Sequence, residues 1–477
     1  MKKTGITGKI AAILFWLCIW QLIAVCIHNQ ILLVGPVEVL KRLRQDAWEL
    51  SFWQTILTSA SRIMAGFLGA FVLGSLFGIL AYRYRWLKEL LAPFMSTVVS
   101  VPVASFAVIL LIWFGAGRLS VWISFLITFP NLYFQVLEGM NSTDKKLLEV
   151  AKVYQISGWN QAWYLYRPAL AGFIRSGCRV SIGLAWKSGV AAEVIGLPEF
   201  SIGEQIYMSK IYLDTAGVLS WTITCICMSV VAEKMVLWIL DRILEADIPI
   251  MGRRRTEHAG SDAVESGEVP QLRITDLRKI YGKHVIIERF TYSFEMGKTY
   301  ALMDPSGSGK TTFFRMLCGL EKVDGGEIHY GERNKVQYIR QKSSIPISGD
   351  CAIVFQENRL FHNLTAEQNL ALADGENRNQ QLNRIVKELL PENSLNRNLG
   401  QFSGGMARRV EVLRCMLSDK KVLLLDEPFN GLDEETKKKT ADFIRKYQGN
   451  RILIIATHSD EEATLLNAEK VSLKVEG

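Results

Sequence analysis

The stretch "MDPSGSGKTT", residues 303–312, is one glycine short of a phosphate-binding loop. The pattern G-x-x-x-x-G-K-[ST] requires glycine at position 304, where this chain has Asp304. Strand-like "KTYALM" runs into the stretch and helical "FFRMLCGL" follows it, which is the strand–loop–helix context that such a loop needs. The sequence therefore predicts a nucleotide phosphate site in an α/β domain.

The residues of this loop have distinct expected roles. Backbone N–H groups from Ser306 to Lys310 are expected to wrap the β-phosphate, helped by the positive end of the following helix. Lys310 supplies a cation for the β- and γ-phosphates, and the Thr311 hydroxyl can ligate Mg²⁺. The residues expected at the ATP phosphates are Asp304, Pro305, Ser306, Gly307, Ser308, Gly309, Lys310, Thr311 and Thr312.

Asp304 leaves two alternatives open. A carboxylate directed at the phosphates would repel them by several kcal/mol at low effective dielectric, whereas one directed away costs little. Aspartate also tolerates unusual backbone angles better than most residues do. Because the other residues needed for hydrolysis are present, we expect ATP turnover to be retained. The alternative is a membrane protein that binds ATP as a sensor without turning it over.

A second motif, "KVLLLDEPFNGLD", covers residues 421–433. Its apolar run predicts a buried strand from Val422 to Leu425 that ends in two acids. Asp426 is expected to hold the Mg²⁺ shell with Thr311, and Glu427 to polarise the attacking water. The two motifs in this order predict a P-loop ATPase.

Between them lies "QFSGGMARRV", which resembles the signature loop of ATP-binding cassette (ABC) ATPases, usually written L-S-G-G-Q. Ser403, Gly404 and Gly405 match that loop, whereas Phe402 and Met406 are variants of its ends. The resemblance extends to four further positions: the adenine-stacking aromatic, the Q-loop glutamine that also contacts the metal, the D-loop aspartate and the catalytic switch histidine, which would be Tyr281, Gln356, Asp433 and His458. It implies that ATP is sandwiched between the phosphate loop of one cassette and the signature loop of another. A homodimer, or a pair with a related half-transporter, is therefore expected.

Residues 1–246 form an expected all-α membrane domain ahead of this α/β domain. The hydrophobic share of 49% is concentrated there, and the net charge of +8 is too small to indicate a nucleic-acid partner. Bilayer-length apolar runs predict six spans. They cover residues 10–27, 63–82, 98–115, 119–137, 176–197 and 216–240. The first run lacks a small-residue cleavage site, so we expect a retained helix rather than a signal peptide.

The distribution of basic residues predicts the orientation. With the N-terminus inside, the inside segments hold ten of the basic residues near the spans and the outside loops five. We then expect the C-terminal domain to lie in the cytoplasm. Residues 247–270, rich in charge, Gly, Ser and Pro, are expected to be a linker, and residues 271–477 the ATPase domain.

Besides Arg179, the fifth predicted span carries two charged residues, Lys187 and Glu193. Ionisable groups at membrane depth usually face a bundle interior or a wet pathway, so both are candidates for a translocation path. Two alternatives stay open: the span starts later, or the charges only neutralise neighbours such as Arg179.

The segment "EVAKVYQISGWNQAWYLYRPAL", residues 149–170, resembles the coupling loop of ABC importer permeases, which we expect over residues 145–168. Glu149, Ala151 and Pro168 match the family pattern, whereas Gln155 stands in place of its usual glycine. The resemblance implies short helices that dock on the cassette near Gln356. The alternative is an amphipathic loop with no special role.

Other stretches, such as "LLVGPVEVLKRL" and "AWKSGVAAEVIG", are similar to permeases for nitrate, sulfonate, taurine and thiamine-pyrimidine precursors. This similarity implies ATP-driven import of a small anionic or polar solute delivered by a separate extracytoplasmic binding protein. A half-size exporter is the rival, since permease ahead of ATPase is the exporter order. Predicted spans of barely bilayer length and a short coupling loop argue against that rival.

Overall fold

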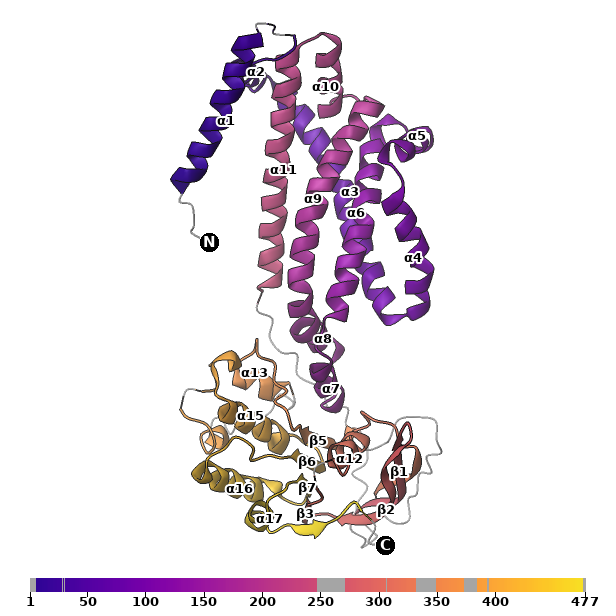
Figure 1. The fold of residues 1–477 in the computed structure, drawn as a ribbon, viewed down its shortest axis with the longest axis vertical. Coiled ribbons are helices and arrows are strands. Elements are labelled where there is room, and N and C mark those ends of the chain that lie inside the picture. Colours follow the sequence, from indigo (N-terminus) through magenta and orange to yellow (C-terminus); the bar gives the residue numbers. More distant parts are fainter. Residues whose placement is uncertain are drawn as a thin grey trace. The chain divides into compact units, whose positions relative to one another are not determined.

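The computed structural model describes residues 6–27, 29, 31–246, 271–305, 307–331, 349–372, 384–392 and 394–474. The chain forms two compact units, one of Met1–Thr143 with Arg167–Asp247 and one of Asp144–Tyr166 with Ile248–Gly477 (Figure 1). We call them the membrane unit and the cassette unit. The predicted linker, 247–270, and Ser306 lie outside the described residues.

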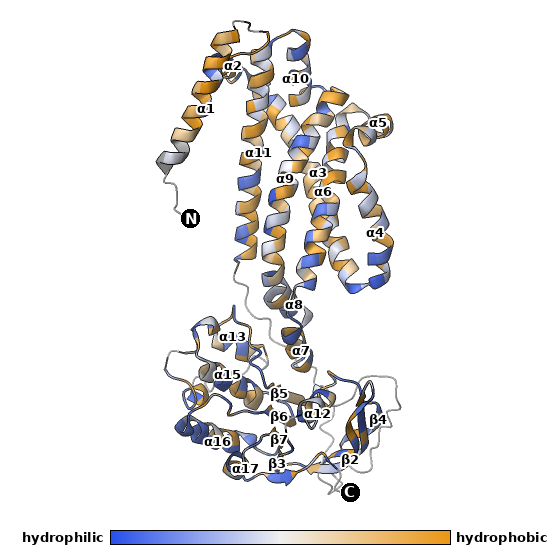
Figure 2. Cartoon of the chain, in the orientation of Figure 1, coloured by the Kyte–Doolittle hydropathy of each residue, from blue (hydrophilic) through white to orange (hydrophobic). Residues whose placement is uncertain are grey.

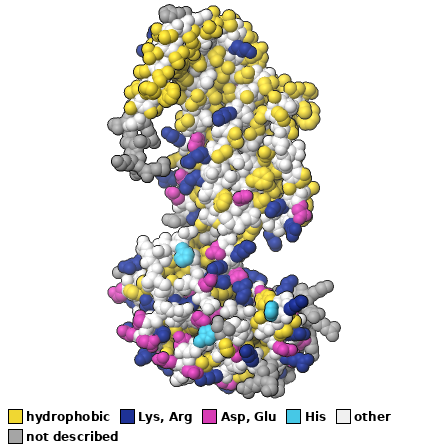
Figure 3. All heavy atoms as spheres, viewed as in Figure 1, with side chains coloured by type: hydrophobic (Ala, Val, Ile, Leu, Met, Phe, Trp, Pro, Cys, Tyr) yellow, Lys and Arg dark blue, Asp and Glu magenta, His cyan; other side chains and the backbone are white. Residues whose placement is uncertain are grey.

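The membrane unit is helical. Its elements are α1 (Ile6–Ile27), α2 (Pro36–Asp46), α3 (Leu50–Arg83), α4 (Arg85–Ser100), α5 (Val103–Phe114), α6 (Ala116–Asn141), α9 (Arg167–Gly196), α10 (Ile202–Ile211) and α11 (Thr215–Leu244). Hydrophobic residues dominate these helices, whereas the cassette unit is mixed (Figures 2 and 3). Helix α6 packs closely against both α3 and α9. A Cβ on Gly66 would lie 2.3 Å from the Val121 carbonyl oxygen, so glycine permits this contact between α3 and α6.

The structure contradicts one predicted span. Residues 98–115 are not a straight helix. The helix is interrupted between α4 and α5, and the direction of the helical axis changes there by 104°. Pro102 explains the break: its ring disfavours helical geometry at Val101, which is extended with φ −79° and ψ 133°. By length and composition, α3, α6 and α11 can cross a membrane, and the bent α4–α5 pair can be counted as a fourth span. Six spans therefore remain a prediction.

The lengths of the helices also overturn one argument from the sequence. Helix α3 has 34 residues, and α9 and α11 have 30 each. At about 1.5 Å per residue, they are roughly 45–50 Å long, well beyond a hydrocarbon core of about 30 Å. The argument that these spans are barely of bilayer length is wrong, so helix length does not exclude an exporter.

The cassette unit contains two sheets. The antiparallel sheet has the order β2-β1-β4 and consists of β1 (Gln271–Tyr281), β2 (His284–Glu295) and β4 (Gly325–Gly331). The parallel sheet has the order β5-β6-β7-β3-β8 and consists of β3 (Thr299–Leu302), β5 (Cys351–Val354), β6 (Val422–Asp426), β7 (Ile452–Ala456) and β8 (Glu469–Val471).

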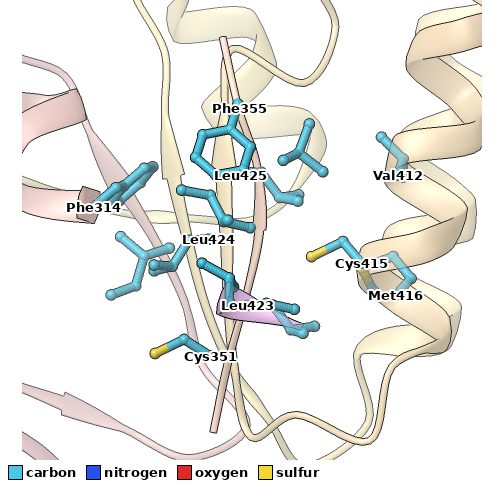
Figure 4. Close-up of a cluster of buried hydrophobic side chains, with 14 of the residues drawn as sticks. Phe314, Cys351, Phe355, Val412, Cys415, Met416, Leu423, Leu424 and Leu425 are labelled. Atoms are coloured by element: carbon cyan, nitrogen blue, oxygen red, sulfur yellow. The ribbon is translucent and has the colours of Figure 1, made fainter. Parts of the chain in front are cut away.

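Burial explains the apolar runs in the parallel sheet. Every residue of β3, β5, β6 and β7 is buried, as expected for parallel strands covered on both faces of the sheet. Leucines of β6 lie among side chains of two helices, including Phe314 from α12 (Lys310–Leu317) and Met416 from α15 (Gly404–Leu417) (Figure 4). This domain also contains α13 (Ala366–Ala371), α16 (Glu434–Gln448), α17 (Asp460–Leu465) and a 3-10 helix at Leu399–Gln401.

The predicted coupling loop forms α7 (Lys145–Val153), α8 (Gly158–Gln161) and a π-helical turn (Ala162–Tyr166). The chain makes the turn between α7 and α8 with Gln155 itself, which adopts a left-handed φ of 51°. Pro168 lies in the first turn of α9, so the predicted loop extends too far, and the cassette unit's segment ends at Tyr166.

Candidate nucleotide site and its coupling segment

The topology gathers the predicted catalytic residues at one edge of the sheet. The phosphate loop follows β3, Glu427 follows β6 and His458 follows β7, and these three strands are neighbours that run parallel. The carboxyl ends of parallel strands meet at the same edge, which is where open α/β sheets bind ligands. Sequence motifs far apart in the chain thereby form one site.

The phosphate loop turns on two glycines with left-handed backbones. Gly307 has φ 81° and Gly309 has φ 98°, conformations that other residues rarely adopt. A Cβ on Gly309 would lie 2.7 Å from Cγ2 of Ile286, so the loop also approaches β2 too closely for a side chain. Lys310 then begins α12.

Asp304 directs its carboxylate toward the C-terminal segment. The Ser472 hydroxyl donates to Asp304 Oδ1 at 2.6 Å, and the Leu473 N–H donates to Oδ2 at 2.7 Å. Asp304 is 5% exposed and has no left-handed φ, so the missing glycine leaves no strained residue at this position. Of the two orientations considered from the sequence, the structure has the one in which the carboxylate is held by the protein.

Lys310 is buried against its own loop. Its ammonium group donates to the carbonyl oxygen of Asp304 and, at 3.2 Å, to that of Pro305. Burial lowers the pKa of Lys310, although the carboxylates of Asp304, Asp426 and Glu427 oppose that shift.

Thr311 and Asp426 meet at the end of β6. The Thr311 hydroxyl donates to Asp426 Oδ2 at 2.7 Å. Burial and the neighbouring Glu427 raise the pKa of Asp426, while the bond from Thr311 opposes the rise. A hydroxyl and a carboxylate oxygen are ligands that Mg²⁺ takes beside nucleotide phosphates, so this pair fits the predicted ion.

Glu427 and His458 face one another across β6 and β7. His458 Nε2 lies 3.5 Å from Glu427 Oε1. Glu427 has a left-handed φ of 49°, and its N–H donates to the Ala456 carbonyl oxygen at 2.9 Å. Non-glycine residues in this region cost about 1–3 kcal/mol and cluster at functional sites.

The predicted signature loop lines a separate cavity of about 580 Å³. Ser403 caps α15 by accepting from the Met406 N–H at 3.3 Å, and Asp433 caps α16 by accepting from Thr436. Residues of the Q-loop, signature loop and D-loop segments line the cavity, among them Gln356, Asn358, Ser403, Gly404, Gly405, Arg409, Asn430 and Asp433. The lining includes no residue of the phosphate loop that the structure describes.

Glu149 binds the candidate coupling segment, Asp144–Tyr166, to two arginines of the cassette. Arg315 of α12 donates to both carboxylate oxygens of Glu149 at 2.9 and 2.6 Å, and Arg359 donates to Oε2. Burial would raise the pKa of Glu149, but the hydrogen bonds and charges of the two arginines outweigh it and lower the pKa. Tyr154 adds a bond from its hydroxyl to the Ile353 carbonyl oxygen at 3.0 Å.

Comparison with known proteins identifies both halves. Residues 287–430 match the family model "ABC transporter". Residues 70–245 match the model "Binding-protein-dependent transport system inner membrane component".

The chain belongs to the ABC transporter family.

Three curated relatives illustrate the match. A sulfate/thiosulfate import ATP-binding protein of Mesorhizobium japonicum is 32% identical over 43% of this chain and 61% of its own length. A "Probable sulfate/thiosulfate import ATP-binding protein" of Chlorella vulgaris is 32% identical over 42% of this chain and 86% of its own length. A thiamine import ATP-binding protein of Shigella flexneri is 27% identical over 42% of this chain and 86% of its own length. The chain spans about three fifths of the first relative and of several similar ones.

Tyr281, the expected adenine platform of this ABC cassette, is accessible. It ends β1 and is 45% exposed. The Lys279 ammonium lies 5.0 Å from its ring centroid and is itself fixed by Glu321 at 3.0 Å. The ring is therefore a partly exposed aromatic surface with a cation beside it.

Lys187 and Glu193, which both lie on α9, do not form one site. Lys187 is exposed, whereas Glu193 is fully buried and accepts from the Ser59 hydroxyl at 2.8 Å and from the Gly203 N–H at 3.3 Å. Arg179 pairs with Glu233 at 3.3 Å rather than with either of them. The structure thus separates Lys187 from Glu193 and contradicts neutralisation by Arg179.

Sequence reasoning missed the arginines of the signature helix that donate hydrogen bonds to the Q-loop segment. Arg408 of α15 pairs with the buried Glu411 at 3.0 Å and donates to the carbonyl oxygens of Phe355 and Gln356. Arg414 donates to the Arg359 carbonyl oxygen at 2.9 Å. The available signal was the spacing of the charges along one helix, since residues three apart share a face.

Proposed function

We propose that the chain is an importer-type ABC half-transporter, in which ATP hydrolysis by two cassettes drives a small solute across the membrane. The observation that carries this proposal is the docking of Asp144–Tyr166 on the cassette through Glu149, Arg315 and Arg359. Arg315 lies on the helix that follows the phosphate loop, and Arg359 lies three residues after Gln356. A segment between two membrane helices is therefore bonded to both nucleotide-contacting elements.

The cavity at the signature loop supports a dimer. The N-terminus of α15 with the Ser403 hydroxyl offers donors for a phosphate, and the positive end of a helix favours an anion there. Because the described lining contains no phosphate loop, a nucleotide bound by a second cassette fits this cavity best. The second cassette belongs to another copy of this chain or to a related half-transporter.

The catalytic step can be assigned to residues of this chain. Lys310 exchanges its hydrogen bonds to the Asp304 and Pro305 carbonyl oxygens for bonds to the β- and γ-phosphates. Glu427 accepts a proton from the attacking water. His458, 3.5 Å from Glu427, can reach the γ-phosphate side of the site. Thr311 and Asp426, with Gln356, would hold Mg²⁺, which supplies positive charge to the transferring phosphoryl group.

For the solute, we propose a small anionic or polar compound of the sulfonate, nitrate, taurine or pyrimidine-precursor type. Relatives named for sulfate/thiosulfate and for thiamine import support the general class. The membrane family model, named for binding-protein-dependent systems, supports a separate extracytoplasmic binding protein as partner. The N-terminus and the cassette would lie in the cytoplasm of a cell with a bacterial-type plasma membrane.

Two alternatives have less support. A half-size exporter matches the order of the domains but not the family model of the membrane half or the importer names of the relatives. The alternative of a non-hydrolysing sensor rested on Asp304 alone. The carboxylate of Asp304 is bound by Ser472 and Leu473. The residues expected to take part in hydrolysis lie at the same edge of the sheet: Lys310, Thr311, Asp426, Glu427 and His458.

Transport direction tests the import proposal. The chain is reconstituted in proteoliposomes with ATP and the cassettes on the luminal side. Labelled taurine, nitrate or sulfate is added outside together with the cognate binding protein, and the solute should accumulate inside. Glu427→Gln, which cannot turn over ATP on this proposal, should not accumulate solute. ATP-driven expulsion of preloaded solute would instead identify an exporter.

A charge placed at the signature loop tests the dimer. We expect Ser403→Asp to weaken ATP-dependent dimerisation and turnover at least tenfold, because aspartate keeps the helix cap but repels the partner's γ-phosphate. Thr365→Asp is the matched control, since Thr365 also caps a helix but lies outside the cavity. Light scattering on the ATP-bound protein measures the association. Equal behaviour of the two variants would contradict the shared nucleotide site.

A further inference from the structure

The C-terminal segment continues the sheet as far as the phosphate loop. Strand β8 pairs in parallel with β3, with Leu302 opposite Val471, and the Met303 N–H donates to the Val471 carbonyl oxygen at 3.4 Å. Beyond that point the side chain of Asp304 replaces a backbone acceptor. It receives the Leu473 N–H at 2.7 Å and the Ser472 hydroxyl at 2.6 Å.

These two bonds fix where the charge of Asp304 lies. The residue is 5% exposed, and a buried carboxylate is costly unless donors satisfy it. Each of its two oxygens has a donor from the C-terminal segment, and hydrogen bonds to a charged acceptor are the stronger kind. The main-chain carbonyl of the same residue accepts from Lys310. Asp304 therefore connects the C-terminal segment to the lysine expected at the phosphates.

We propose that Ser472 and the Leu473 N–H are positioning groups of the nucleotide loop, which hold the Asp304 carboxylate away from the phosphates so that ATP affinity depends on the C-terminal segment. The inference rests on the proposed function only in taking this loop as the ATP site. A glycine at position 304, as in the usual pattern, has no charge to hold and needs no such partner.

Because Asp304 carries a charge, the proposal predicts an effect that depends on the charge of the nucleotide and on salt. A carboxylate released from Ser472 gains access to the loop interior, where its repulsion of a ligand grows with the number of phosphate charges. Salt weakens the repulsion because it screens charges. A general loss of folding would instead affect all nucleotides alike and would not respond to salt in this way.

The test is a double-mutant cycle on the full-length protein in nanodiscs. Equilibrium binding of ATP, ADP and AMP is measured for wild type, Ser472→Ala, Asp304→Gly and the double variant. We expect Ser472→Ala to weaken ATP binding roughly tenfold, ADP binding less and AMP binding least, since hydrogen bonds to charged groups contribute this much. In the Asp304→Gly background the same change should have no effect. Higher salt should shrink the loss.

Ser293→Ala is the matched control, because this hydroxyl also donates to a side-chain oxygen, Gln271 Oε1 at 2.9 Å, but lies on the antiparallel sheet. Thermal unfolding without nucleotide checks that Ser472→Ala folds. The proposal is overturned if Ser472→Ala binds ATP like wild type, or loses equal affinity with and without Asp304. Because binding is measured without turnover or transport, this failure is distinct from that of the proposed function, which would appear as absent ATP turnover or as expulsion of solute.

Discussion

Glu427→Gln should reduce ATP turnover by roughly 10²–10⁴-fold, the range contributed by a general base, while the protein still binds Mg-ATP. Glutamine has the same shape as glutamate but cannot accept a proton from the attacking water. The position is fixed by the backbone, because Glu427 is held at a left-handed φ of 49° directly after β6. Phosphate release measures turnover, and a fluorescent nucleotide measures binding.

The control for this variant is Glu434→Gln, which removes an exposed carboxylate in the first turn of α16. It should keep wild-type turnover. If Glu427→Gln retained more than about a tenth of wild-type turnover, another group would be the base, contrary to the assigned role. If wild type itself bound ATP without turnover, the sensor alternative would replace the transporter.

Glu149→Gln should reduce transport by roughly tenfold or more while the cassette keeps basal ATP turnover, because coupling between two sites typically amounts to 5–150-fold. The glutamate accepts from two arginines at once, and glutamine has neither the charge nor two acceptor oxygens for that arrangement. Both arginines would then be left without their shared anion at the docking surface. Solute uptake and phosphate release, measured on the same proteoliposomes, give the ratio that the variant should change.

The matched control is Lys146→Ala, which removes the neighbouring ion pair with Glu357. The two side chains of that pair are 53% and 62% exposed, and exposed pairs contribute little. Transport should therefore fall less than about twofold in the control. Equal losses in both variants, or a loss of ATP turnover in parallel with transport, would contradict a coupling role for Glu149.

The lowered pKa of Glu149 fixes the sign of a pH effect on this docking. A carboxyl whose pKa is lower in the folded protein stabilises it above the ordinary pKa of 4.5, and this contribution is lost as the pH falls toward the folded value. Coupling through Glu149 should accordingly be constant around neutral pH and weaken only in acid.

The candidate nucleotide site could be proposed from the sequence because its parts are local patterns. A glycine-rich loop after a strand, and two acids after another strand, each identify their own chemistry within about ten residues. Parallel strand topology then places Lys310, Glu427 and His458 at one sheet edge. Pro102 was also a local signal, for the break between α4 and α5, but the sequence interpretation used only the apolar run of bilayer length.

Contacts between distant residues were not predictable from one sequence. Asp304 looked like a defect in the loop, and only the pairing of β3 with β8 brings Ser472, 168 residues away, to its carboxylate. Arg315 and Arg359 carry no motif that links them to Glu149. Such partners depend on how separate elements pack, and no periodicity in the chain encodes that arrangement.

The sequence by itself determined a membrane half, a cassette half, and the residues expected to bind and cleave a nucleotide, because backbone geometry and side-chain type act over a few neighbouring positions. Only the tertiary structure decided where the charge of Asp304 points and which groups hold Glu149. The energy of a buried carboxylate depends on the donors that surround it, and these donors come from other parts of the chain.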